Sequence, residues 1–277
     1  MSRYKKTTAS HYEKLIKEGR GQGRGKNYQP WLTVRDVPST GLSTRIAGWK
    51  TERVHHFLSK LELSYFYILE WSPTVTDIRE QYPLPFDATL DIADRLGIRH
   101  PYVNQLNDYA VMTTDFLIDI VIDDQPKMLA RSIKPESELA SKRTLEKMMI
   151  EKTFWEERGI DFKVVTEREI SKSLSDNIEF IYTAKNLSDS PGLDIQMLSQ
   201  IEAVLYQKLR SHSLSVSKTA LGVDEQLGLE PGTSLWVVKH LIANRMWNVD
   251  MSVKIDPLKS LIFSRNIKSE TRERMVG

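Results

Sequence analysis

Two acidic residues and one lysine form the most informative chemical pattern in this sequence. Asp115 lies near the start of one predicted strand, and Ser132 and Lys134 lie two positions apart on the next. Residues at i and i+2 of a strand share a face, so Ser132 and Lys134 are expected to point the same way. Glu62 lies on the flank of a predicted helix, about 80° from the centre of its apolar stripe.

These residue types suit the hydrolysis of a phosphodiester. That reaction needs a hard cation held by oxygen ligands, and a positive group that positions water and offsets developing negative charge. Glu62 and Asp115 are candidate carboxylate ligands, the backbone carbonyl of Ile133 is a third oxygen, and Lys134 is the candidate positive group. Strand-borne aspartate and lysine are common, so the residues alone leave a purely structural role open.

Several other chemistries are excluded or unsupported by the sequence. The chain has no cysteine, which excludes disulfides, thiolate metal sites and a cysteine nucleophile. It also lacks a G-x-S-x-G motif, so a serine hydrolase has little support. None of the six histidines belongs to an H-E-x-x-H or comparable ligand pattern: His11, His55, His56, His100, His212 and His240. His55 and His56 begin a predicted helix, where a surface or capping role is expected.

A glycine cluster near the N-terminus resembles a phosphate-binding loop but has the wrong spacing. Lys26 is followed by Asn27 rather than by Ser or Thr, and position 20 is arginine where a glycine is required. The same segment carries three cations, Arg20, Arg24 and Lys26. It is interpreted as a flexible basic segment that contacts a nucleic-acid backbone, with a solvated loop as the alternative.

The charge distribution is asymmetric although the total is nearly neutral. The 277 residues contain 39 Lys+Arg and 37 Asp+Glu, a net charge of +2. Residues 1–60 hold 13 of the cations and 4 of the acids, a net of +9, which leaves −7 on residues 61–277. The basic part precedes Glu62, where a DNA backbone would have to approach. With neither a signal peptide nor an apolar run near the ~20 residues that span a bilayer, the sequence predicts a cytoplasmic protein without a membrane partner.

The residues around the candidate site follow an α/β pattern. Apolar spacing predicts a helix from Arg53 to Trp71, with Glu70 on its polar surface. A second helix is expected from Ser141 to Arg158, with Leu145, Met148, Met149 and Trp155 inward and Gly159 as its stop. The remaining expected elements are a strand at 74–82, a helix from Asp87 to Leu96, a hairpin of strands at 114–122 and 127–134, and a strand at 161–166.

The C-terminal part reads as a second, smaller domain. Residues 184–194 are rich in Ser, Asp, Pro and Gly and are interpreted as a linker between domains at 1–183 and 195–277. Helices at 195–209, 217–227 and 233–243, followed by a strand-like stretch at 246–254, favour a winged helix-turn-helix. A helical cap on the first domain is the alternative. Lys239 is the candidate DNA contact on the third helix.

The site residues are similar in order to those of known nucleases. Glu62, Thr-Asp115-Phe-Leu and Ser132-Ile-Lys134-Pro resemble the E…D…(E/Q)xK site of restriction-type endonucleases. Longer segments are similar to the TnsA family, the endonuclease subunits of heteromeric transposases of Tn-seven-type transposons. These segments span nearly all of residues 17–165: KEGRGQGRGKNYQPWLTVRDVPS (17–39), KTERVHHFLSKLEL (50–63), DIREQYPL (77–84), TTDFLID (113–119), IKPESEL (133–139) and RTLEKMMIEKTFW (143–155).

The resemblance implies a restriction-endonuclease-like mixed sheet flanked by helices, followed by a winged-helix domain. It also implies Mg²⁺-dependent cuts on the 5′ strands of double-stranded DNA at transposon ends, in the bacterial nucleoid. A DDE-type subunit, TnsB, would process the 3′ strands, and an ATPase regulator, TnsC, would bind the C-terminal domain. Glu62 and Asp115 match the family's metal ligands, Lys134 matches its catalytic lysine, and Glu151 matches a further acidic position.

One position departs from the family pattern. The family has glutamine two residues before the lysine, whereas this chain has Ser132, whose side chain is shorter and a poorer metal ligand. Ser132 therefore supports a second hypothesis, in which the chain is a catalytically silent adaptor that links DNA to the ATPase. A stand-alone transcription factor is a third possibility, but it leaves the nuclease-like pattern unexplained.

Overall fold

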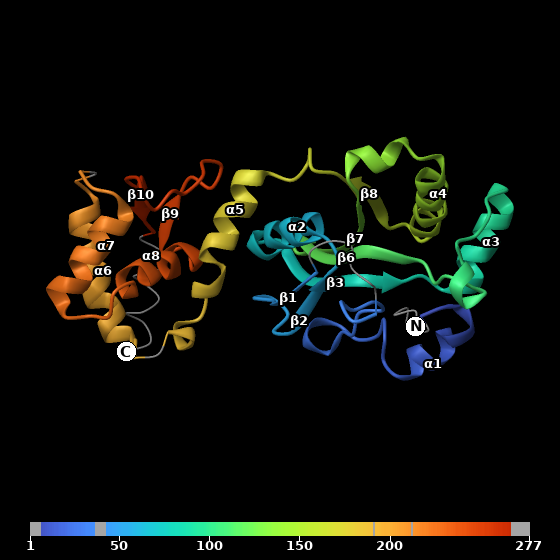
Figure 1. The fold of residues 1–277 in the computed structure, drawn as a ribbon, viewed down its shortest axis with the longest axis horizontal. Coiled ribbons are helices and arrows are strands. Elements are labelled where there is room, and N and C mark those ends of the chain that lie inside the picture. The colour runs from blue at the N-terminus through green and yellow to red at the C-terminus, as the bar shows by residue number, and fades with distance from the viewer. Residues whose placement is uncertain (1–6, 37–42, 191, 212, 267–277) are drawn as a thin grey trace. The chain divides into compact units, whose positions relative to one another are not determined.

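The computed structural model describes residues 7–36, 43–190, 192–211 and 213–266 (Figure 1). These residues form two compact units, Met1–Ile170 and Ser171–Gly277, each with its own core. His212 and the part of the expected C-terminal domain beyond residue 266 lie outside the described residues. Among the described helices, none combines the length and the apolar character needed to cross a bilayer.

A four-stranded mixed sheet organises the first unit. Its strands are β3 (Val75–Pro83), β6 (Thr113–Ile122), β7 (Gln125–Ile133) and β8 (Asp161–Val165), in the order β3-β6-β7-β8. Strand β6 pairs antiparallel with both β3 and β7, whereas β8 runs parallel to β7. Together with the flanking helices, this sheet confirms the predicted mixed α/β class.

A tight turn joins β6 to β7 and fixes how the two strands pair. Asp123 and Asp124 both have positive φ, 51° and 58°. Such a two-residue turn matches the right-handed twist of the strands it connects. Pairing then runs from Ile122 with Gln125 to Phe116 with Arg131. The register therefore brings the start of β6 beside the end of β7.

The two faces of the sheet are covered differently. On one face, Phe116 packs with Phe57 and with Tyr65, and Phe57 packs with Phe66. Neighbouring residues of a strand point to opposite faces, so Leu117 faces the other way. Leu117 and Ala130 there belong to a core made with α3 (Phe86–Leu96) and α4 (Lys142–Glu156). The sheet is thus buried on both sides, which holds its strand ends in fixed positions.

The helix predicted from Arg53 to Trp71 is wrong in its first part. Val54–Phe57 forms strand β2, which pairs with β1 (Thr44–Ala47), and helix α2 covers only Lys60–Trp71. Ser59 starts this helix because its Oγ accepts a hydrogen bond from the Glu62 N–H. Glu70 is not a surface residue either: it is buried and accepts a hydrogen bond from the Trp49 N–H.

Helix α4 presents a different face to the core than the apolar residues alone predict. Trp155 is buried as predicted, but Leu145 and Met149 are exposed and Glu151 is buried. The indole Nε1–H of Trp155 donates to Thr114 Oγ1 at 2.7 Å, which fixes this face of α4 against β6. A hydrophobicity pattern misses this orientation because it places a glutamate on the solvent side. The predicted stop at Gly159 is confirmed, with φ of 66°.

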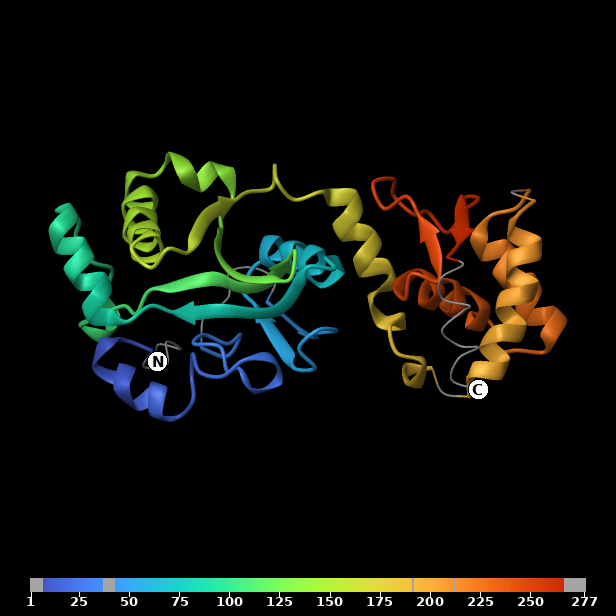
Figure 2. The same ribbon diagram turned by 180° about the vertical axis from the view of Figure 1, so that it is seen from behind.

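The basic N-terminal segment is packed along β3 rather than forming a free loop (Figure 2). It includes α1 (Tyr12–Lys17) and a 3-10 turn, Gly25–Asn27. Three contacts fasten it to the strand: Gly25 N–H to Asp77, Tyr28 hydroxyl to Glu80 O, and Trp31 N–H to Gln81 O. A side chain at Gly21 would collide with Pro83, since its Cβ would lie 2.2 Å from the ring. Gly21 therefore serves close packing against β3.

The second unit is helical with a small ribbon. It contains α5 (Lys172–Ile181), α6 (Ile195–Leu209), α7 (Val216–Leu227) and α8 (Thr233–Ala243), with the antiparallel strands β9 (Trp247–Val249) and β10 (Phe263–Arg265). Helix α5 belongs here because the Asn177 amide donates to the carbonyls of Met251 and Val253. The units thus divide upstream of the expected linker at 184–194. The winged-helix identity of this unit stays a prediction.

Candidate active site

Asp115 is the centre of a hydrogen-bonded cluster at the start of β6. Its Oδ2 accepts from the Ile133 N–H at 2.7 Å and from Lys134 Nζ at 2.8 Å, and it lies 3.4 Å from Ser132 Oγ. Its Oδ1 accepts from Gln81 Nε2 at 3.3 Å. Asp115 is only 7% exposed. The structure therefore brings Asp115, Ser132, Ile133 and Lys134 together as the sequence predicts.

Lys134 carries its positive charge into this cluster. Its Nζ also donates to the Ile133 carbonyl at 3.0 Å. Burial disfavours the charged ammonium, but the charge of Asp115 and their hydrogen bond outweigh burial and raise the pKa of Lys134. Lys134 thus stays protonated near neutral pH. It can orient water or stabilise a phosphate oxygen, but it cannot act as a general base there.

Glu62 is held by the start of its own helix. Its Oε1 accepts from Ser59 Oγ at 2.9 Å and its Oε2 from the Leu58 N–H at 3.1 Å. Burial, and then the nearby Asp115 charge, raise the pKa of Glu62 to about 7. Two carboxylates that repel each other in this way favour a cation between them. The carboxylates of Glu62 on α2 and Asp115 on β6 are therefore close enough to repel each other.

Glu151 faces the same cluster from α4. Burial, and then the Asp115 charge, raise the pKa of Glu151 to about 8, while hydrogen bonds with Thr114 and Ser132 act the other way. Its Oε1 is buried without a hydrogen-bond partner among the described residues. A buried polar atom without a partner is costly, and such atoms occur at functional sites. Glu151 thus lies at the site together with the other three predicted charged residues, Glu62, Asp115 and Lys134.

The donor set at Asp115 fits a hard divalent cation. No group of three or more His, Cys, Asp or Glu residues in the described parts of the chain is arranged as a metal cluster. Mg²⁺, however, usually binds through one or two carboxylates and keeps several water ligands. Glu62, Asp115 and the Ile133 carbonyl supply two carboxylates and one neutral oxygen. The Lys134 ammonium already contacts Asp115 Oδ2 and the Ile133 carbonyl, so this position attracts positive charge.

Gln81 belongs to the site but was not predicted from the sequence. It is 2% exposed and has a positive φ of 49°, which is uncommon outside glycine. Its Oε1 accepts from Thr113 Oγ1 at 3.0 Å while its Nε2 donates to Asp115. The strand pairing passes from Glu80 to Tyr82 and omits Gln81. The sequence feature that could have indicated Gln81 as a site residue is its position directly before Tyr82-Pro83 at the end of a strand.

The predicted DNA contacts have distinct surroundings. Arg20 is an internal residue: its Nη1 donates to the Trp31 carbonyl at 2.6 Å and to Asp36 Oδ2 at 2.9 Å. Arg24 Nη1 lies 2.7 Å from Asp119 Oδ2, yet the side chain is 66% exposed. Lys26 is exposed. Lys239, in the second unit, lies over the Phe180 ring with its Nζ 4.3 Å from the centroid. Their DNA-binding roles stay predictions.

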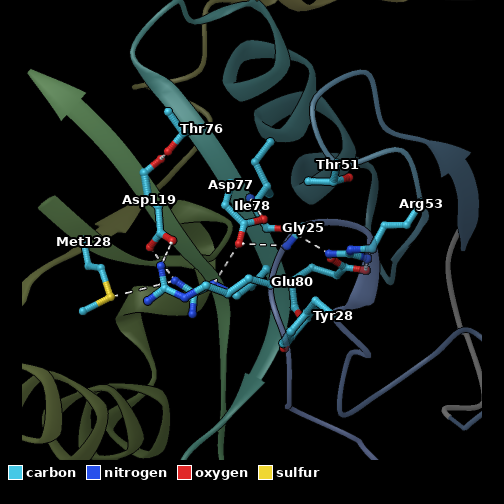
Figure 3. Close-up of polar contacts among 12 residues, drawn as sticks. Gly25, Tyr28, Thr51, Arg53, Thr76, Asp77, Ile78, Glu80, Asp119 and Met128 are labelled. Carbon is cyan, nitrogen blue, oxygen red and sulfur yellow. Dashed lines mark hydrogen bonds and ion pairs between the residues drawn. The ribbon is translucent and has the colours of Figure 1, made fainter. Parts of the chain in front are cut away.

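Buried ion pairs join β3 to the segment at the start of β2 and to β6 (Figure 3). Glu80 pairs with Arg53 and with His55, whose Nδ1 lies 2.8 Å from Glu80 Oε2. Burial alone would raise the pKa of Glu80, but His55 and Arg53 lower it strongly. Arg79 pairs with Asp119 on β6. The expected surface or capping role of His55 is wrong, because the side chain is fully buried on a strand.

Comparisons with known proteins agree with this geometry. A family described as TnsA-like endonuclease N terminal matches residues 72–167, and one described as TnsA endonuclease C terminal matches residues 169–251. The first match includes Asp115, Ser132, Lys134 and Glu151, whereas Glu62 precedes it. The chain is also 40% identical over 257 residues to the transposon Tn7 transposition protein TnsA of Escherichia coli, with 92% of each chain covered. The chain therefore belongs to the TnsA endonuclease family.

Proposed function

We propose that the protein is the Mg²⁺-dependent endonuclease subunit of a cut-and-paste transposase, and that it cleaves the 5′ strands at transposon ends. The observation that carries the proposal is the contact of Lys134 Nζ with Asp115 Oδ2 and the Ile133 carbonyl. It places a permanent cation beside oxygens that suit a metal, as hydrolysis of a phosphodiester requires. The products are a 5′-phosphate and a 3′-hydroxyl.

Each residue of the cluster has a role in this proposal. Glu62, Asp115 and the Ile133 carbonyl hold the metal, which when bound offsets negative charge on the scissile phosphate. Lys134 donates hydrogen bonds that orient the attacking water and the phosphate oxygen. Ser132 contacts Asp115 Oδ2 through its hydroxyl, so it helps to orient the carboxylate rather than replacing the family's glutamine as a ligand. Glu151 closes the buried side of the site.

The partners in the proposal come from the family resemblance. Double-stranded DNA at the transposon ends is the substrate, a DDE-type subunit (TnsB) processes the 3′ strands, and an ATPase regulator (TnsC) controls the assembly. The near-neutral total charge supports this dependence on partners, because a chain with a net charge of +2 gains little affinity from the DNA backbone alone.

Nicking of transposon-end DNA, in the presence of both partner subunits and Mg²⁺, tests the proposal. Asp115→Ala and Lys134→Met are expected to abolish 5′-strand cleavage. Lys127→Met removes an exposed lysine from the far end of the same strand β7 and should cut like wild type. Cleavage by Asp115→Ala at the wild-type rate would sink the site assignment. An adaptor would instead give no nicking in wild type, and no Mn²⁺ binding that depends on Glu62 and Asp115 in calorimetry.

A further inference from the structure

A cavity of about 250 Å³ opens beside the candidate active site. One face of α4 forms a wall of it, because its residues Thr144, Lys147, Met148 and Glu151 follow one another at helical spacing. Lys134 lines the same cavity, and so does the segment from Ala110 to Thr113 that leads into β6. A molecule in this cavity would therefore touch both α4 and the catalytic lysine.

Lys147 differs from the other cations of α4. Lys142 and Arg143 pair with Glu146, and Lys152 pairs with Glu156. Among the described residues, by contrast, no carboxylate forms an ion pair with Lys147, although Glu138 also lines the cavity. Arg143 lies four residues before Lys147, and like charges at this spacing destabilise a helix.

The charges around Lys147 compensate it only in part. Partial burial in the cavity wall, and then the charges of Arg143 and Lys134, lower the pKa of Lys147, while the charge of Glu138 acts the other way to a smaller extent. Lys134 and Lys147 thus line the same cavity, and of the two only Lys147 forms no ion pair with a carboxylate among the described residues, so its charge is available to an anion.

A second hollow is also lined by basic residues. Its volume is about 350 Å³, and it is lined by Arg99, His100, Tyr102, Asn104, Arg143 and Glu146. Pro101 lines the first hollow, its sequence neighbours His100 and Tyr102 line the second, and residues of α4 line both. Cations line each hollow, Lys134 and Lys147 the first and Arg99 and Arg143 the second, and the two hollows together form the basic path.

We infer that this path carries the backbone of the DNA strand being cut, and that Lys147 binds the phosphate adjacent to the scissile one. The inference rests on the proposed function and adds the substrate-binding residue and the direction of the strand. Lysine suits this role because a phosphate oxygen needs only a point charge. A single such contact contributes to binding and to its salt dependence, not to the chemical step.

Binding of a fluorescein-labelled duplex of one transposon end to the full-length chain tests the inference. Fluorescence anisotropy at several low salt concentrations gives the affinity and the slope of log K against log[salt]. Lys147→Gln should weaken binding several-fold and reduce the slope by roughly one. Lys147→Arg should restore both. Lys152→Gln removes the same charge from an ion-paired position of the same helix and should behave like wild type.

The outcomes separate this inference from the proposed function. If Lys147→Gln and Lys152→Gln bind with the same affinity and slope, the inference fails, even when Asp115→Ala abolishes nicking. Salt-independent binding by wild type would also overturn it. If Asp115→Ala nicks like wild type, the proposed function fails, whatever the binding data show. Circular dichroism melting of Lys147→Gln and Lys147→Arg checks that both variants fold, as expected for an exposed side chain.

Discussion

The side-chain amide of Gln81 on β3 donates to the carboxylate of Asp115 on β6, with Nε2 3.3 Å from Oδ1. Thr113 fixes the other end of the amide. Gln81 reaches this position only because its backbone adopts a positive φ of 49°. A non-glycine residue in this region costs on the order of 1 kcal/mol, so the surrounding contacts must hold it there.

Removal of the Gln81 amide is expected to loosen Asp115 without removing a ligand. Gln81→Leu keeps the volume but loses the hydrogen bond, so the Mg²⁺ concentration for half-maximal nicking should rise roughly 10-fold or more, as for other residues that orient metal ligands. Gln81→Gly should show the same rise but lose less stability, because glycine accepts the positive φ without strain. A Mg²⁺ dependence equal to wild type in both variants would refute the positioning role.

The Ser59 cap is expected to serve both the helix and the site. Ser59→Ala removes the acceptor for the Glu62 N–H and the donor to Glu62 Oε1, so unfolding free energy should fall by about 1 kcal/mol. Metal affinity, measured by Mn²⁺ calorimetry, should fall as well. Ser215→Ala removes the matching cap of α7 in the second unit and should lower stability alone. Equal metal affinity in Ser59→Ala and wild type would contradict the expectation.

Glu151 is expected to make stability depend on pH. Its folded pKa of about 8 lies above the ordinary 4.5, so the folded state binds an extra proton between these values. Its contribution to stability is complete below about pH 4.5 and is lost as pH rises through 8. Glu151→Gln cannot ionise, so its stability relative to wild type should increase with pH, by roughly 5 kcal/mol at pH 9, because each pKa unit of the shift is worth about 1.4 kcal/mol.

Urea unfolding at pH 5, 7 and 9 measures this difference. Glu156→Gln, at an exposed position at the end of α4, serves as the control and should track wild type at each pH. A stability difference between Glu151→Gln and wild type that stays constant from pH 5 to pH 9 would rule out ionisation of Glu151 as its source.

Of the three candidate DNA contacts near the N-terminus, Arg20 is expected to stabilise the fold, whereas Arg24 and Lys26 are expected to bind DNA. Arg20→Ala should lower stability by roughly one to a few kcal/mol, because it removes the cation that pairs with the buried carboxylate of Asp36. Arg24→Ala and Lys26→Ala should hardly change stability, since both side chains are largely exposed. Only these two are expected to weaken duplex binding at low salt. Thermal melting and anisotropy titrations distinguish the two roles, and a folded Arg20→Ala with weakened binding would contradict the assignment.

The sequence predicts the strands and the central cluster well for a physical reason. Alternation within 114–122 and 127–134 predicts both strands, and the tight turn between them predicts the pairing. Asp115, Ser132 and Lys134 follow from these features, because register determines which side chains share a face. The contacts at Asp115 Oδ2 agree with that expectation.

The errors occur where polar residues are buried. His55 and Glu70 lie inside the protein because each has a specific partner: the His55 ring bonds to the carboxylate of Glu80, and Glu70 accepts from the Trp49 N–H. A prediction from hydrophobic periodicity treats such polar residues as exposed to solvent. The predicted helix therefore begins at Arg53 and includes the residues that form β2. Gln81 was missed for a related reason, since an irregular backbone position has no hydrophobic signature.

The two-aspartate turn between β6 and β7 has a consequence at the other end of the hairpin. The turn fixes the register of β6 and β7, and this register brings Asp115 beside Ser132 and Lys134. A change of one residue in the length of β6 between Asp115 and the turn would place the carboxylate on the aromatic face, where Phe57 and Phe66 pack, together with every other side chain of β6 that is shifted. The turn fixes the pairing of the two strands. Only a change of two residues in the length of β6 would therefore keep Asp115 on its present face of the sheet.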